Sequence, residues 1–176
     1  FCNRSVFKCS MNQTVETVFP DIAIPSPTYS VAQAPDKDIY IGTESNGLYI
    51  YSENWKLKKH VPIDGIIATI LPDNNGDIWL GLDETGICLF NKNKQTFTWL
   101  HKDNTNLNNN SIRTFVSYGD SSILVGTFRG LNILNKKELT ITPANINIAG
   151  KGGLSHYSIH SMLIDKDQTL WIGTYS

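Results

Sequence analysis

Short apolar runs separated by polar turns recur along the chain, and the clearest of them is DNNGDIWLGL at residues 73–82. Each recurrence ends on a glycine: Gly42, Gly81, Gly126 and Gly173. The three residues before each of these glycines are apolar or aromatic in every copy. Twelve positions before the glycine, every copy has a small hydroxyl side chain: Ser30, Thr69, Thr114 and Ser161. Agreement at several fixed positions indicates copies of one structural unit.

The spacing of the copies predicts the fold class. Successive glycines are 39, 45 and 47 residues apart. A repeat of roughly 40–50 residues that holds about four short strands is typical of a β-propeller blade. Helical repeats have similar periods, but these apolar runs are short, rich in β-branched and aromatic residues, and bounded by Asn, Asp and Gly, which favours strands. We therefore expect an all-β chain, a β-propeller segment of four-stranded antiparallel blades.

The repeats divide the chain into a half blade, three whole blades and a second half blade. The third and fourth strands of a preceding blade are predicted in residues 1–27, and the first two strands of a further blade in residues 157–176. The whole blades are predicted at residues 28–65, 66–110 and 111–156. Either the two halves close a small four-bladed ring, or the chain is a fragment of a larger propeller. The fragment is favoured, because the sequence stops where the other copies place a second glycine.

Composition and charge narrow the choice of partners. The chain has 176 residues, of which 40% are hydrophobic, enough for a core. A net charge of −1 and a pI near 6.5 disfavour nucleic acid and anionic membranes as partners. A Cys2–Cys9 disulfide is possible in an oxidising compartment, although no framework of spaced pairs supports it. We expect Cys88, which lies in a predicted strand, to be a packed thiol.

Two runs carry a resemblance to a known family. They are IIATILPDNNGDIWLGLDETGICLF at residues 66–90 and YSIHSMLIDKDQTLWIGTYS at residues 157–176. Their shared pattern, IxxIxxDxxGxIWxGTxxxGL, resembles the two-component regulator propeller repeat. That repeat builds the periplasmic sensor regions of bacterial hybrid two-component system histidine kinases. The resemblance is good over residues 28–176 and weak over residues 1–27.

The resemblance implies a function that the residues alone do not give. It implies a ligand-sensing segment of a seven-bladed type of propeller, located in the periplasm, which meets the remaining blades of the same propeller. The ligand would be an oligosaccharide or another small molecule, and binding would regulate transcription of glycan-use genes. The signal would pass through a kinase outside this chain, in a parent protein that forms a homodimer. The segment itself would not be an enzyme.

Candidate binding residues lie where propellers usually meet ligands, at the start of the first strand and in the loop between the second and third strands. The position thirteen before each glycine differs from copy to copy, which indicates release from packing. Aromatic faces suit the C–H surfaces of sugars, and Arg, Asn and carboxylates suit hydroxyls. Ordinary solvated loops are the alternative interpretation. The candidates are Tyr29, Glu44, Asn46, Asp83, Glu84, Arg113, Phe128, Arg129, His160 and Tyr175.

Other chemistry finds little support in the sequence. No motif for a nucleophile, a phosphate-binding loop or a dinucleotide is present. The run Asp73-x-Asn75-x-Asp77 imitates a calcium loop, but its glycine falls two positions early, so we expect no metal and no cofactor. A propeller glycoside hydrolase or lyase that uses Glu44, Asp83, Glu84 and His160 remains an alternative, as does a non-catalytic scaffold or dimerisation module. Trp79 and Trp171 are expected to pack between blades.

Overall fold

The computed structural model describes residues 6–9, 11, 15–18, 24–145 and 153–175. Every regular element in these ranges is a β-strand, and all pairings are antiparallel. The prediction of an all-β fold with four-stranded antiparallel sheets is therefore confirmed. Within the described ranges, no helix is long and apolar enough to span a membrane.

The strands form five sheets in chain order. A two-stranded sheet comprises β1 (Val6–Cys9) and β2 (Val15–Val18). Blade 1 comprises β3 (Thr28–Gln33), β4 (Ile39–Thr43), β5 (Leu48–Tyr51) and β6 (Leu57–Val61). Blade 2 comprises β7 (Ile67–Pro72), β8 (Asp77–Leu82), β9 (Gly86–Asn91) and β10 (Thr96–Leu100). Blade 3 comprises β11 (Ile112–Tyr118), β12 (Ser122–Thr127), β13 (Gly130–Asn135) and β14 (Thr140–Pro143). Blade 4 comprises β15 (Ile159–Ile164) and β16 (Leu170–Thr174).

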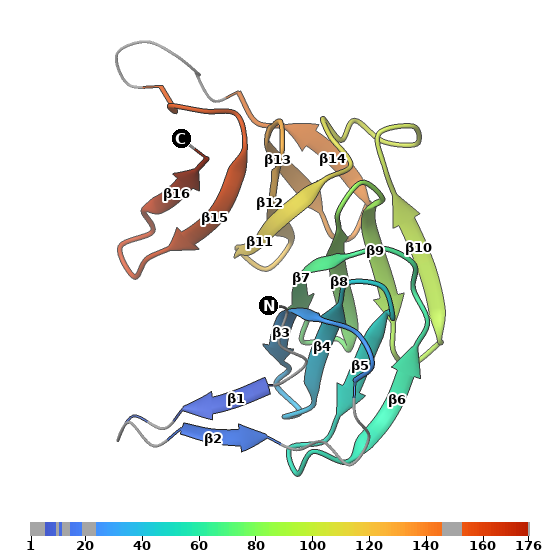
Figure 1. Ribbon diagram of the computed structural model, residues 1–176. Helices are drawn as coiled ribbons and strands as arrows, with labels where there is room; N and C mark the ends of the chain where they lie inside the picture. The colour runs from blue at the N-terminus through green and yellow to red at the C-terminus, as the bar shows by residue number, and fades with distance from the viewer. Residues whose placement is uncertain (1–5, 10, 12–14, 19–23, 146–152, 176) are drawn as a thin grey trace.

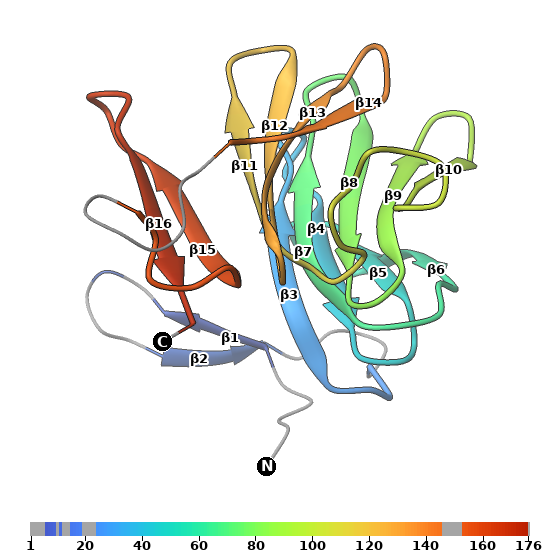
Figure 2. The same ribbon diagram turned by 90° about the horizontal axis from the view of Figure 1, so that it is seen from above.

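The sheets follow one another around an arc, with β1–β2 and β15–β16 at its two ends (Figure 1). Seen from above, neighbouring blades stand side by side with their faces toward one another (Figure 2). The first strand of each blade lies on the inner side of the arc, where β3 contacts β7, β7 contacts β11, and β11 contacts β15. Residues at the start of these strands are therefore brought near one another from different blades.

The repeat glycine marks the place where the next blade approaches. A Cβ added at Gly81 would lie 2.5 Å from Cγ2 of Ile112, a residue on the first strand of blade 3. The same relation joins Gly42 to the fully buried Ile67. A hydrogen bond supports this contact, because the hydroxyl of Ser30 donates to the carbonyl of Ile67 at 2.7 Å. The glycine is thus a requirement of blade packing, and in blade 1 the small hydroxyl residue also bonds to the next blade.

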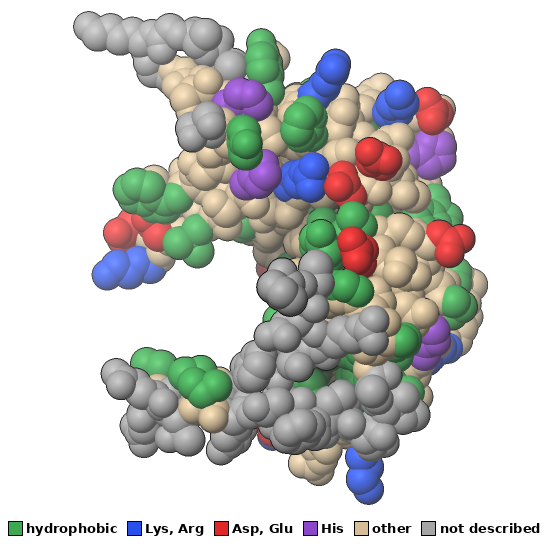
Figure 3. All heavy atoms as spheres, viewed as in Figure 1, with side chains coloured by type: hydrophobic (Ala, Val, Ile, Leu, Met, Phe, Trp, Pro, Cys, Tyr) green, Lys and Arg blue, Asp and Glu red, His purple; other side chains and the backbone are tan. Residues whose placement is uncertain are grey.

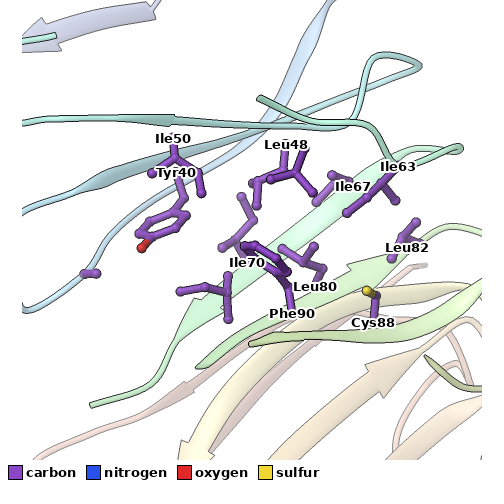
Figure 4. Close-up of a cluster of buried hydrophobic side chains, with 13 residues drawn as sticks. Tyr40, Leu48, Ile50, Ile63, Ile67, Ile70, Leu80, Leu82, Cys88 and Phe90 are labelled. Carbon is purple, nitrogen blue, oxygen red and sulfur yellow. The ribbon is translucent and has the colours of Figure 1, made fainter. Parts of the chain in front are cut away.

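Apolar side chains fill the spaces between blades. Between blades 1 and 2, side chains from both sheets point toward one another, among them Tyr40, Leu48, Leu80 and Phe90 (Figure 4). Between blades 2 and 3, the core contains Trp79 from β8 with residues of β11 and β12. Burial of these faces stabilises the fold, because it removes apolar surface from water.

The two repeat tryptophans differ in environment. Trp79 is 1% exposed, as expected for a residue that packs between blades. The expectation is wrong for Trp171, which is 61% exposed because no further blade lies against β16 in the described part of the chain. Its indole N–H instead donates to the carboxylate of Asp165 at 2.7 Å, and this bond holds the pKa of Asp165 below its usual value.

Blades 1 and 2 are also joined by charged groups. The buried carboxylate of Asp38 accepts hydrogen bonds at 2.7 Å from both Lys58 and Lys92. Lys92 also donates to Asp36 at 2.7 Å, and this bond lowers the pKa of Asp36 although partial burial opposes the shift. A buried carboxylate is stable only with such partners, so Asp38 fixes how the two blades sit together.

Cys88 is a buried thiol in β9, as expected, and burial raises its pKa to about 12. Cys2 is not among the described residues, so the possible Cys2–Cys9 disulfide lies outside them.

Since the thiolate is the reactive form, Cys88 should resist a disulfide reagent at pH 8 in the folded protein and react at once in urea. A chain carrying Cys2→Ser and Cys9→Ser isolates this reaction. Rapid modification without denaturant would contradict the packing of β9.

Candidate functional site

Every blade has a β-bulge at the start of its first strand. The pairing of β11 with β12 shifts between Ile112 and Thr114, so Arg113 is the extra residue. The same shift leaves Tyr29, Ala68 and His160 unpaired in β3, β7 and β15. A bulge residue is released from the ladder and its side chain is re-aimed, which is why bulges are common beside binding sites. This explains why the position varies between copies while its neighbours do not.

The loop that follows the second strand is held beside the bulge by a repeated backbone bond. In all four blades, the second residue after the repeat glycine donates its backbone N–H to a carbonyl. The acceptor is the residue fifteen positions before the glycine. In blade 3, Phe128 donates to Ser111 at 3.0 Å, and in blade 4, Tyr175 donates to Ser158 at 3.1 Å. Loop residues and bulge residues therefore come together on one face at fixed positions.

Blades 2 and 3 share a cluster built around Arg113. Its Nη1 donates to the carboxylate of Asp83 at 3.3 Å, and its guanidinium carbon lies 5.9 Å from the centroid of the Phe128 ring. Two buried atoms of this pair, Nε of Arg113 and Oδ1 of Asp83, have no partner within the described residues. Buried polar groups normally find partners, so these two atoms set the cluster apart from the rest of the blade surfaces.

Blade 4 contributes an aromatic cluster. The ring of Tyr175 lies 5.6 Å from that of His160 and 6.1 Å from that of His156. The backbone N–H of Ser158 donates to Nδ1 of His156 at 3.0 Å, so Nε2 carries the proton when this ring is neutral. The hydroxyl of Ser158 is fully buried without a partner in the described part of the chain. These groups present donors and ring faces to the same side of the blade.

A hollow of about 370 Å³ lies between blades 3 and 4. It is lined by Phe128, Arg129, His156 and Tyr157. Figure 3 shows histidine, basic, acidic and hydrophobic side chains gathered over blades 3 and 4 on one face. Sequence reasoning missed His156, Tyr157 and Ser158. Because the segment before β15 does not align between repeats, the only available signal was its position just ahead of a first strand.

The candidates of blade 1 stand apart from this group. The structure records no hydrogen bond, ion pair or ring contact between Tyr29, Glu44 or Asn46 and the other seven candidates, within the ranges it describes. Asn46 serves its own loop, since its side-chain oxygen accepts from the Tyr49 hydroxyl and its carbonyl contacts Nε2 of His60 at 2.7 Å. Glu84 lies on the exposed loop of blade 2, with φ of 63°.

The site offers recognition groups more than catalytic ones. The carboxylate of Asp83 is engaged in an ion pair with Arg113, an arrangement suited to holding polar groups in place. In the described residues, no group of three His, Cys, Asp or Glu side chains could hold a metal ion. The carboxylate of Asp77 accepts from the side-chain amides of Asn75 and Asn91 and so closes its own hairpin.

Comparison with known proteins addresses the last repeat directly. Residues 153–176 match the family model of the two component regulator propeller. The last repeat of the chain is therefore similar to a repeat of this family. The resemblance noted from the sequence is thereby confirmed, and the matched residues include His156, His160 and Tyr175 of the aromatic cluster. None of the curated proteins compared with the chain matches it.

Solved structures of extracellular domains are similar to this chain. The extracellular domain of the putative hybrid two component system BT3049 from B. thetaiotaomicron is 26% identical, with a TM-score of 0.67 over 97% of this chain and 24% of that one. The extracellular domain of the putative one component system BT4673 from B. thetaiotaomicron is 18% identical, with a TM-score of 0.72 over 99% of this chain and 25% of that one.

A further relative shows how widely the fold is shared. The β-propeller domain of Cps50 (Swd1) from Myceliophteria thermophila is 11% identical, with a TM-score of 0.69 over 97% of this chain and 56% of that one. At such identity the likeness concerns the fold alone. The chain spans about a quarter of the length of the first two structures, so it corresponds to part of their extracellular domains.

Proposed function

We propose that this chain is the ligand-sensing part of a periplasmic sensor in a two-component signalling protein, and that its ligand is an oligosaccharide. Binding regulates transcription of glycan-use genes through a histidine kinase outside the 176 residues. The observation that carries the proposal is that two clusters, Arg113 with Phe128 and Tyr175 with the two histidines, border the hollow between blades 3 and 4. The regulator propeller repeat and the similarity to an extracellular two-component domain support it.

The chemistry of the group suits a sugar. The exposed rings of Phe128 and Tyr175 offer flat apolar surfaces to the C–H faces of a pyranose. Arg113 and the proton on Nε2 of His156 donate to ring and hydroxyl oxygens, while Asp83 accepts from hydroxyls.

The position of the group also suggests how binding is transmitted. Arg113 and His160 belong to the first strands of different blades, and those strands contact one another. A ligand that touches both side chains is sensitive to the relative position of blades 3 and 4. Such a ligand stabilises one arrangement over another only by its difference in affinity for the two. We propose that this shift reaches the kinase through a homodimer of the parent protein.

The test is a thermal-unfolding screen of the chain against a panel of defined oligosaccharides, with chromatographic analysis of each mixture for products. We expect one structural class of oligosaccharide to raise the midpoint and to remain intact. A ligand at a hundredfold excess over its Kd stabilises the folded state by about 2.7 kcal/mol, a readily measured effect. Product formation would replace the sensor by a hydrolase or lyase, and a panel without any effect would favour a scaffold.

A further inference from the structure

A second hollow lies on the outer rim of the arc, beside the outer strand of blade 2. It measures about 440 Å³ and is bounded by residues 62–65, which connect blades 1 and 2, by Thr85, and by Phe97 and Trp99 of the outer strand β10. We name it the rim cleft. It shares no residue with the candidate group, so an inference about it does not rest on the proposed function.

Two aromatic side chains form one wall of the rim cleft. Phe97 and Trp99 occupy alternate positions of β10 and so lie on the same face of the strand. Phe97 stacks on Phe90, with ring centroids 5.1 Å apart and planes inclined by 23°, and this contact fixes its orientation. Phe97 is nevertheless 43% exposed and Trp99 36% exposed. Both rings therefore leave a substantial apolar surface toward the cleft.

The blade fold does not explain the indole of Trp99. Its partner on the neighbouring strand is Cys88. At the equivalent places, His60 pairs with Tyr49 in blade 1, and Pro143 pairs with Asn132 in blade 3. Neither blade needs a large aromatic residue at this position. The position of Phe97 differs, because the other outer strands also have an apolar residue there, so Phe97 serves packing as well.

Polar groups complete the rim cleft. The carboxylate of Asp64 is exposed and has no hydrogen-bond or ion-pair partner in the described part of the chain. The hydroxyl of Thr85 makes one long bond, donating to the carbonyl of Asp83 at 3.4 Å. An apolar wall with one carboxylate acceptor and one hydroxyl is suited to a ligand that has a flat apolar face and several hydroxyl groups.

We infer that the rim cleft is a binding subsite for a neutral pyranose, with the sugar ring stacked on Trp99 and its hydroxyls donating to Asp64. An organic cation is the other ligand that aromatic rings and a carboxylate attract. The structure disfavours it, because the ammonium of Lys59 already lies 5.9 Å from the centroid of Phe90, the ring beneath Phe97. A second cation on the same aromatic stack would meet repulsion, whereas a neutral sugar would not.

The test is an NMR titration of the chain with cellobiose, with maltose and with choline. The indole N–H signal of Trp99 is identified by its loss in Trp99→His, which introduces the residue found in blade 1. We expect one disaccharide to shift this signal and the amides of Gly65 and Thr85 in a saturable manner at millimolar concentration. Trp171 is the internal control, because its exposed indole should not move.

Variants separate this subsite from the group on blades 3 and 4. Trp99→His and Asp64→Asn should each weaken disaccharide binding by about tenfold or more while the amide spectrum keeps its dispersion. Arg113→Ala, which alters only the other group, should leave the Trp99 titration unchanged. A shift by choline and not by sugar, equal shifts of Trp99 and Trp171, or no shift at all would each overturn the inference.

Discussion

Replacing Trp79 by alanine should lower the free energy of unfolding by about 3–5 kcal/mol. The indole is 1% exposed and lies in the core between blades 2 and 3, against side chains of β11 and β12. Alanine removes the apolar contact and leaves a cavity that the two sheets close only in part. Urea denaturation followed by circular dichroism measures the effect as a lower midpoint, with a slope that changes little if the transition stays two-state.

Trp171→Ala is the matched control, because Trp171 occupies the same repeat position. Its indole is 61% exposed and its recorded bond is to an exposed carboxylate, so the loss should be about 1 kcal/mol or less. The comparison therefore tests burial and not residue type. Equal losses from the two variants would show that the arrangement of blades 2 and 3 described here is wrong.

Gly81→Ala should destabilise the chain by about 1–3 kcal/mol, although a single methyl group is added. That group would lie 2.5 Å from Cγ2 of Ile112 and 2.5 Å from Cγ2 of Thr69, so blade 3 must move away from blade 2. The conformation of the residue itself is not the cause, since Gly81 is not among the residues with positive φ. The readout is again the midpoint of urea denaturation.

Gly173→Ala separates steric crowding between blades from other effects of the substitution. At this equivalent position the only close side-chain atom among the described residues is Oγ of Ser161, 2.4 Å from the added group, and a hydroxyl turns away by rotation. The loss of stability should be clearly smaller than for Gly81→Ala. A loss as large at Gly173 would mean that the glycine is needed by its own hairpin and not by the neighbouring blade.

Much of the fold follows from the repeat itself. The sequence places an apolar run directly before each repeat glycine, and β4 and β8 contain the runs that end at Gly42 and Gly81. The glycine recurs because a side chain at this position would collide with an isoleucine of the next blade in three of the four copies. The exposure of Trp171 was missed, because equivalence between repeats says how a residue packs and not whether a neighbour is there.

The candidate site was predictable only in part. Variation at Arg113 and His160 correctly indicated residues outside the packing pattern, and the bulge supplies the physical reason. Which of the varying residues meet was beyond the sequence, since contacts between blades depend on how the strands curve. Ser158 lies outside the aligned strands, where no repeat is available for comparison, and it was therefore not foreseen. Trp99 lies in the outer strand β10, and its partial exposure depends on packing that the repeat pattern does not describe.

We propose that the face of blades 3 and 4 binds an oligosaccharide through Arg113. The deciding experiment is calorimetric titration of the stabilising oligosaccharide into the chain, into Arg113→Ala and into Lys166→Ala. Alanine is already the bulge residue of blade 2, at Ala68, so the backbone accepts it. Lys166→Ala removes an exposed cation from the hairpin between β15 and β16, away from the loops of the site.

We expect Arg113→Ala to weaken binding by at least about tenfold, because hydrogen bonds to a charged group contribute about 1.5–3 kcal/mol. Lys166→Ala should bind as the unchanged chain does. If Arg113→Ala binds the oligosaccharide with undiminished affinity while its unfolding midpoint is preserved, the ligand does not occupy this face and the account of the site is contradicted.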